Sequence, residues 1–178
     1  ILNLAYSTKQ AERKVEFTVE QRHNAAVGIA TESMVLLKNE DNILPLKSKT
    51  VAVGGSIPII GGIGSSRVCT AHEIKPLVEN LKEEMPNIQF ETFSDCIYLN
   101  GDATAMHFKR CYAKAYENDT VILTVSNGPF NEGEGYDRYT LKLHPRVEEL
   151  ICRVSEINKN LIVIIYAGGA VDVSAWVD

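Results

Sequence analysis

Apolar residues form continuous runs in three places along the chain, at residues 50–55, 119–125 and 160–166. Each run is short and bounded by polar or turn-forming residues, which is typical of a strand buried on both faces of a parallel sheet. Residues 88–93 instead alternate apolar and polar side chains, so they predict an edge or half-exposed strand. Together these segments predict one sheet.

Segments between these strands have the apolar spacing of amphipathic helices. The first lies within residues 20–38, and Thr18 and Gln21 have the spacing of a capping box at its start. From Ser33 onward the spacing changes to a short apolar run, so we expect the helix to give way to an extended segment there. Helical spacing recurs in three later segments, residues 73–84, 102–117 and 145–157.

Helices and strands alternate along the chain, which favours an α/β fold with a three-layer, open and mainly parallel sheet flanked by helices. We expect a flavodoxin-like α/β sandwich. The chain begins at Ile1 without a methionine and stops shortly after Trp176, in a stretch that still has the character of structured protein. We therefore expect a piece of a longer protein, with the sandwich truncated at its C-terminal end.

Composition and charge narrow the classes of function. Of 178 residues, 45% are hydrophobic and 23% are charged, which suits one compact domain. The formal net charge of -5 provides no basic surface for nucleic acid or an anionic membrane. No apolar run approaches the roughly 18 to 20 residues that cross a bilayer. Nucleic acid and membrane are therefore not expected partners.

The cysteines, Cys69, Cys96, Cys111 and Cys152, are scattered without a Cys-x-x-Cys pair or a histidine at metal-binding spacing. The histidines lie in separate segments of the chain. We expect free thiols in a reducing compartment, hence a cytoplasmic location, and neither a metal site nor a cofactor.

Two loops follow predicted strands at the edge where parallel sheets collect ligands. The glycine-rich loop at residues 61–67 lacks the third glycine of a dinucleotide fingerprint, and no Gly-Lys-Ser/Thr follows it. A tight turn is the favoured interpretation of this loop, and nucleotide binding is disfavoured. Residues 127–140, the acidic loop, are the most polar part of the sequence.

The acidic loop contains Glu132, Glu134 and Asp137 within six residues, with glycines on both sides of Glu134. Crowded carboxylates repel one another, which pushes one carboxyl of such a group toward the protonated form that a general acid requires. The same residues also fit a solvated loop in which Asp137 pairs with Arg138 or is merely exposed. The spacing of a calcium-binding EF-hand loop is absent.

Four groups of residues resemble, in order and spacing, the motifs of one enzyme family. They are residues 30–40 with 43–46 (ATESMVLLKNE and ILPL), 51–54 with 61–66 (VAVG and GGIGSS), 134–138 with 149–151 (EGYDR and ELI), and 169–172 (GAVD) with Trp176. The chain thus resembles the second, non-barrel domain of family 3 glycoside hydrolases, the β-glucosidase and β-xylosidase group. On this resemblance residues 1–18 are the tail of the preceding barrel helix with a linker. Residues 19–178 are then the C-terminal α/β sandwich domain, incomplete because the family's closing segment does not follow Trp176.

The resemblance implies retaining hydrolysis of terminal, non-reducing β-linked sugars, with an aspartate nucleophile on a (β/α)8 barrel and a general acid/base on this domain. By its position in the motif, Glu134 is the expected acid/base, and Glu132 is the fallback. Asp137 and Arg138 are expected to brace the loop or to contact the sugar. No cofactor is implied, and the chain alone is expected to be inactive.

The implied partners are a β-linked oligosaccharide or glycoside and the barrel domain of the same polypeptide, over which this domain acts as a lid. Assembly into a homo-oligomer is left open. Two other classes of function fit the sequence. A non-catalytic sugar-binding or interaction domain would bind sugar without the barrel, and a flavodoxin-like nucleotide-binding module that held flavin would be yellow on purification.

Overall fold

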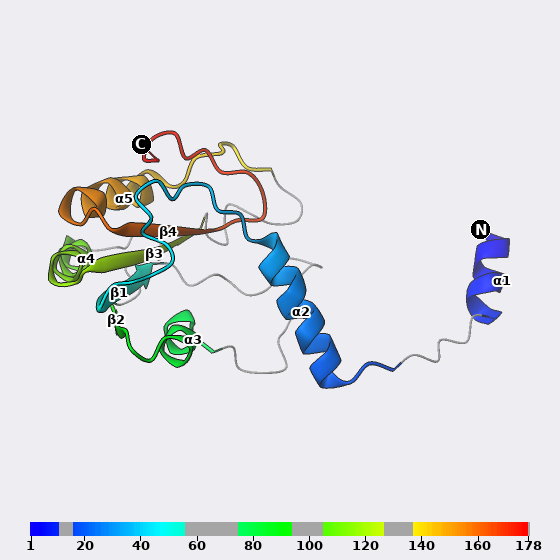
Figure 1. Ribbon diagram of the computed structural model, residues 1–178. Coiled ribbons are helices and arrows are strands. Elements are labelled where there is room, and N and C mark those ends of the chain that lie inside the picture. The colour runs from blue at the N-terminus through cyan, green and yellow to red at the C-terminus, as the bar shows by residue number, and fades with distance from the viewer. Residues whose placement is uncertain (11–15, 56–74, 94–104, 127–136, 178) are drawn as a thin grey trace. The chain divides into compact units, whose positions relative to one another are not determined.

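The computed structural model describes residues 1–10, 16–55, 75–93, 105–126 and 137–177 (Figure 1). The chain divides into two compact units, residues 1–38 and 39–178. The first unit contains helices α1 (Leu2–Gln10) and α2 (Val19–Ser33). The second contains, in order, β1 (Thr50–Gly55), α3 (Leu77–Glu84), β2 (Gln89–Thr92), α4 (Ala105–Glu117), β3 (Thr120–Ser126), α5 (Pro145–Ile157) and β4 (Leu161–Tyr166).

Helix α2 begins at the capping box that the sequence predicts. The Thr18 hydroxyl accepts a hydrogen bond from the backbone N–H of Gln21 at 3.1 Å, and the Gln21 side-chain oxygen accepts one from the N–H of Thr18 at 2.9 Å. These bonds satisfy backbone donors that the start of a helix leaves without intrahelical partners. The helix ends at Ser33, and Met34 is extended with ψ 131°. The predicted change to an extended segment is therefore confirmed.

The strands of the second unit form a parallel sheet in the order β2-β1-β3-β4. In this register Val51 of β1 lies opposite Phe90 of β2, and Val53 of β1 lies opposite Ile122 of β3. The order is that of the first four strands in a flavodoxin-like sheet. The predicted α/β fold with a parallel sheet is confirmed.

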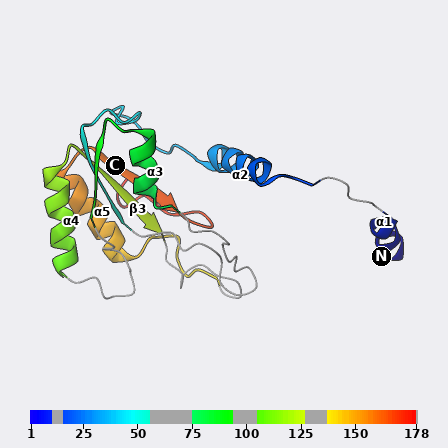
Figure 2. The same cartoon turned by 90° about the horizontal axis from the view of Figure 1, so that it is seen from below.

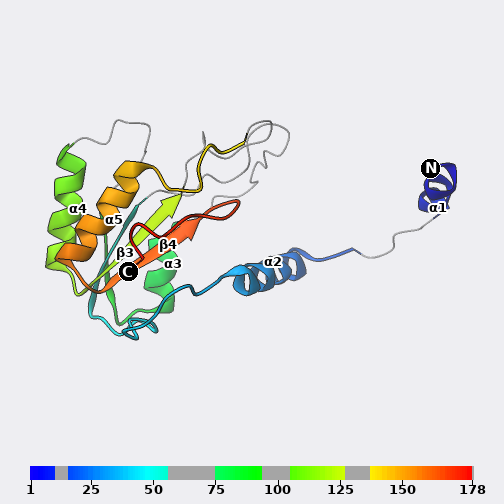
Figure 3. The same ribbon diagram turned by 90° about the horizontal axis from the view of Figure 1, so that it is seen from above.

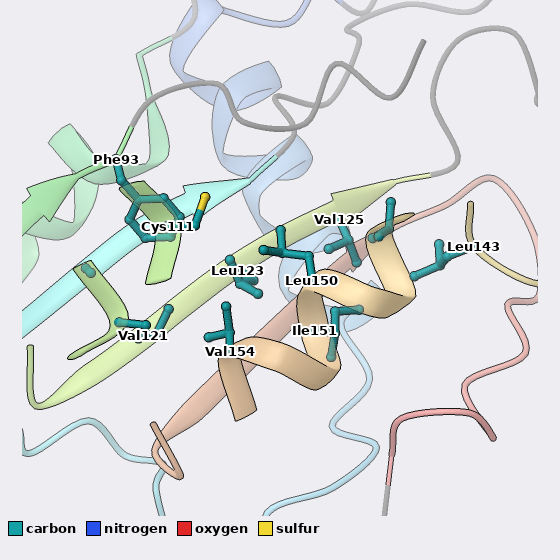
Figure 4. Packing of buried hydrophobic residues seen from close by; sticks show 12 residues of the cluster. Phe93, Cys111, Val121, Leu123, Val125, Leu143, Leu150, Ile151 and Val154 are labelled. Atoms are coloured by element: carbon teal, nitrogen blue, oxygen red, sulfur yellow. The ribbon is translucent and has the colours of Figure 1, made fainter. Parts of the chain in front are cut away.

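Helices cover both faces of this sheet. Neighbouring side chains of β3 point to opposite faces, so the residues that pack against them show which helices lie on each face. Val121, Leu123 and Val125 pack into a cluster with buried residues of α4 and α5 (Figure 4). Ile122 belongs to a second cluster, against which Leu77 of α3 packs. Figure 2 shows α4 and α5 next to each other, with α3 on the other side. The predicted three-layer arrangement is confirmed.

Two details of the sequence prediction are wrong. The apolar run at residues 160–166 predicts a strand buried on both faces, but β4 is an edge of the described sheet and its residues are only half-buried. An apolar run indicates that both faces meet apolar side chains, and it does not indicate how many strands lie beside it. The helix predicted from residue 73 begins only at Leu77 in the described residues, because Pro76 is extended with ψ 147° and a proline disfavours helix at the residue before it.

The other predicted elements are found close to their expected bounds. Strand β1 and helix α5 match residues 50–55 and 145–157, and β3 is displaced by one residue from 119–125. The alternating segment 88–93 contains the edge strand β2. Helix α4 is described from Ala105, and residues 102–104 of the predicted helix lie outside the described residues. None of the helices in the described parts of the chain is long and apolar enough to cross a membrane.

A carboxylate joins β1 to β3 at the end of the sheet where these strands begin. The backbone N–H groups of Thr50 and Lys49 donate to the Asp119 carboxylate, each at 3.1 Å, and the Thr50 hydroxyl accepts from the N–H of Asp119 at 3.0 Å. These donors, Thr50 first and then Lys49, hold the pKa of Asp119 below its usual value because they stabilise the ionised carboxyl.

This shift predicts a pH-dependent contribution to stability. Since the folded-state pKa lies below the ordinary value of 3.8, the contribution is present above that pH and is lost as the pH falls through the folded-state pKa. Asp119→Asn should therefore reduce the fall in Tm between pH 6 and pH 3, measured by the fluorescence of Trp176, the single tryptophan. Asn160→Ala is the control, because it removes a hydrogen bond to the Asp119 carbonyl and leaves the carboxyl in place. An unchanged fall in Tm for Asp119→Asn would contradict this prediction.

Candidate active site

Strands β1 and β3 end at the same edge of the sheet. The arrows of β3 and β4 point the same way (Figure 3), and β1 is parallel to β3, with Gly55 opposite Thr124. The chain therefore leaves β1 and β3 from adjacent points of the carboxyl edge, where open parallel sheets bind ligands. The glycine-rich loop at 61–67 and the predicted acid/base residues, Glu134 and Glu132, lie outside the described residues.

Arg138 connects the end of the acidic loop to the turn that follows β4. Its guanidinium Nη2 donates a hydrogen bond to the backbone carbonyl of Ala170 at 2.8 Å. A Cβ added at the neighbouring Gly169 would lie 3.0 Å from the same Nη2, so the absence of a side chain at this position leaves room for the guanidinium. Asp137 is exposed. The guanidinium thus contacts a residue far along the chain.

Backbone pairing continues this connection. The N–H of Asp172 donates to the carbonyl of Leu141 at 2.9 Å, and Lys142 and Asp172 form an isolated parallel bridge. Directly after this pairing Leu143 is 1% exposed and belongs to the core (Figure 4). Residues 137–143 are thus held by the turn on one side and by the core at their end.

The Asp172 carboxylate takes part in hydrogen bonds within the turn after β4. Its Oδ1 accepts hydrogen bonds from the Ser174 hydroxyl at 2.6 Å and from the Ser174 N–H at 3.0 Å. These bonds, that of the hydroxyl first, hold the pKa of Asp172 below its usual value. The carboxylate shapes the turn between β4 and Trp176, and Trp176 packs against the core.

The side chains that most often bind metal ions do not cluster in the part of the chain that the structure describes. No group of three or more histidine, cysteine or acidic side chains within the described ranges is arranged to hold a metal ion. His144 acts instead as the N-cap of α5, and its Nδ1 accepts a hydrogen bond from the Arg146 N–H at 3.3 Å.

The sequence comparison decides the family. Residues 34–178 match the profile of the glycosyl hydrolase family 3 C-terminal domain. The chain belongs to glycoside hydrolase family 3. The family 3 resemblance drawn from the sequence motifs is therefore confirmed, and the parallel sheet, the acidic loop and the turn at 167–172 are parts of this C-terminal domain.

Individual relatives agree with this assignment. The family 3 domain is 30% identical over 172 residues to thermostable beta-glucosidase B of Acetivibrio thermocellus, which covers 94% of this chain and 22% of that protein. It is 28% identical over 173 residues to an exo-alpha-(1->6)-L-arabinopyranosidase of Bifidobacterium breve, covering 90% of this chain and 22% of the relative. Among solved structures it is similar to the GH3 beta-glucosidase of Bifidobacterium adolescentis, with a TM-score of 0.78 and 26% identity over 98% of this chain and 26% of that one. The chain thus spans about a quarter of the length of the proteins it matches.

The contact between Arg138 and Ala170 is the feature that sequence reasoning missed. The sequence singled out Arg138 and the segment 169–172 separately, as parts of two motifs. It could not pair them, because the acceptor is a backbone carbonyl that any residue carries. The consecutive glycines at 168 and 169 were the available signal that the backbone there lies close to another group.

Proposed function

We propose that this domain supplies the general acid/base of a retaining β-glycosidase, and that the aspartate nucleophile lies on a barrel domain of the same polypeptide. The observation that carries the proposal is the match of residues 34–178 to the family 3 C-terminal domain. In this proposal the domain acts as a lid over the terminal, non-reducing β-linked sugar of a glycoside or oligosaccharide. The first relative, a beta-glucosidase, supports a β-glucosidase-like activity.

The chemistry requires two carboxyl groups with different roles. One attacks the anomeric carbon, and the other protonates the departing oxygen and then activates water. In a retaining enzyme the two lie roughly 5 Å apart across the scissile bond. We assign the second role to Glu134, with Glu132 as the fallback, because the acidic loop begins where β3 ends at the carboxyl edge of the sheet. The nucleophile must then come from outside this domain.

The residues that follow Glu134 support the assignment through their environment. Arg138 donates to the Ala170 carbonyl, and Leu143 is buried in the core. A general acid needs a position defined to well under 1 Å relative to the leaving oxygen, and a loop whose end is held in this way meets that need better than a freely solvated one.

We also place the enzyme in a reducing compartment, the cytoplasm. The support is that the sequence holds no Cys-x-x-Cys pair and that Cys152, which is half-buried, is a free thiol. Cys69 and Cys96 lie outside the described residues.

The proposal predicts a division of activity between domains. The purified chain, folded as judged by circular dichroism, should show no turnover of aryl β-glycosides, whereas the complete polypeptide with its barrel should hydrolyse them. Proton NMR during the reaction should show that the first sugar released is the β-anomer. Hydrolysis by the isolated chain that a substitution within it abolishes would place the nucleophile here, and release of the α-anomer would overturn the retaining mechanism.

A further inference from the structure

The contact between the acidic loop and the turn after β4 lies outside the regular secondary structure, yet it joins segments that are distant in sequence. Arg138 donates to the carbonyl of Ala170 at 2.8 Å, and Leu141 accepts from the N–H of Asp172 at 2.9 Å. Two separate points along residues 138–141 therefore contact two points along residues 170–172. A segment held at two points is fixed in direction as well as in position.

The turn after β4 is held in place by its own hydrogen bonds and by packing against the core. The Asp172 carboxylate accepts two hydrogen bonds from Ser174, which closes the turn locally. Val171 and Trp176 pack against the core formed by β3, α4 and α5. The carbonyl of Ala170 thus lies between residues that the core and the turn hold in place.

A side chain at residue 169 would crowd the guanidinium of Arg138. A Cβ at this position would lie 3.0 Å from Nη2 and 3.9 Å from Cζ of Arg138. Since 3.0 Å is shorter than an ordinary contact between a carbon and a nitrogen, any side chain here would displace the guanidinium by a few tenths of an ångström. The Ala170 carbonyl thus accepts the hydrogen bond from Arg138, and Gly169 leaves space for the guanidinium beside it.

We infer that Arg138 is a positioning residue of the glycosidase, which acts through its contact with Gly169 and Ala170 to fix where the acidic loop returns to the sheet after Glu134. This inference rests on the proposed function of Glu134 as the acid/base. Of the two roles expected for Arg138, the contact of its guanidinium with the domain's own backbone favours that of bracing the loop. Lysine cannot reproduce the planar, forked guanidinium. An Arg138→Lys enzyme should therefore keep only part of the kcat/KM for an alkyl glucoside that depends on this contact.

The test uses the complete enzyme and two substrates, an alkyl β-glucoside with a poor leaving group and a dinitrophenyl β-glucoside with a good one. Arg138→Ala should lower kcat/KM for the alkyl glucoside roughly 10- to 100-fold, the scale of a misplaced catalytic group, and should affect the dinitrophenyl glucoside much less. Gly169→Ala should change the same ratio in the same direction by a smaller amount. Arg153→Ala is the matched control, because Arg153 is an exposed arginine paired with Glu156, and it should leave both values unchanged.

Double variants separate this inference from the proposed function. If Arg138 acts through Glu134, Arg138→Ala should add little to the loss already caused by Glu134→Gln with the alkyl glucoside. Likewise, Gly169→Ala should have no effect when Arg138 is already alanine. Full additivity of Arg138→Ala with Glu134→Gln, or an equal loss with both substrates, would overturn the positioning role and indicate direct sugar binding. Failure of the proposed function appears separately, as a Glu134→Gln enzyme with no dependence on the leaving group.

Discussion

Glu134→Gln is expected to lower kcat/KM of the complete enzyme for an alkyl β-glucoside by about 10²- to 10⁴-fold, the usual contribution of general acid catalysis. The alkoxide that departs from this substrate is a poor leaving group and needs a proton from the enzyme. A dinitrophenolate departs without one, so formation of the glycosyl-enzyme from a dinitrophenyl glucoside should be largely spared. The measurement is kcat/KM for a series of glucosides ordered by the pKa of their leaving groups.

Glu132→Gln is the matched control for this series, because it removes a carboxylate two positions away in the same loop. If Glu132 acts only by like-charge repulsion on its neighbour, its variant should show no steep dependence on the leaving group. A steep dependence in Glu132→Gln together with a flat one in Glu134→Gln would move the acid/base two residues upstream. Flat series for both variants would place the acid outside this loop.

Gly55→Ala is expected to have a large effect on stability. Gly55 has φ +121°, and a Cβ built there would lie 2.0 Å from the backbone oxygen of Thr124 on the neighbouring strand. Such a backbone conformation costs a non-glycine residue roughly 1 to 3 kcal/mol, and relief of the overlap requires β1 and β3 to separate at roughly similar cost. We expect a loss of about 2 to 6 kcal/mol in the free energy of unfolding.

The measurement is denaturant unfolding of the chain followed by the fluorescence of Trp176, which packs against the core beside the sheet. Gly28→Ala is the control, because Gly28 lies within α2 and a Cβ there would meet nothing within 4 Å. This change should leave the Trp176 transition in place and should favour the helix by about 0.5 to 1 kcal/mol, seen as a gain in helical circular dichroism. A Gly55→Ala loss below about 1 kcal/mol would contradict the geometry at the end of β1.

The sequence predicted the central strands well because burial on both faces leaves a distinct pattern. Strand β1 matches its predicted bounds, and β3 is buried from Thr120 to Val125. The same pattern misled for β4, whose residues are apolar on both faces but which has a described neighbour on one side only. The side-chain pattern of a strand indicates what covers its two faces. The neighbouring strands in the sheet pair with it through backbone groups that nearly every residue carries, so the pattern does not reveal them.

The sequence predicted which residues could carry the chemistry of the candidate site, but it predicted only part of the contacts between them. The crowded carboxylates and their glycines drew attention to the acidic loop, and the motifs pointed to Glu134. The contact of Arg138 with Ala170 spans 32 positions in the chain and ends on a carbonyl, so no residue type marks it. By contrast, the turn in which Asp172 accepts from Ser174 is local, and Asp-x-Ser spacing is a recognisable turn signal.

Azide rescue of Glu134→Ala in the complete enzyme tests the central claim most directly. With a dinitrophenyl β-glucoside the variant should form the glycosyl-enzyme and then stall, because no general base activates water for the second step. Azide is a nucleophile that needs no base, so its addition should restore turnover and yield a β-glucosyl azide, identified by NMR and mass spectrometry. Absence of this product from Glu134→Ala, and its formation by a variant altered elsewhere, would contradict the assignment of Glu134 as the acid/base that this domain contributes.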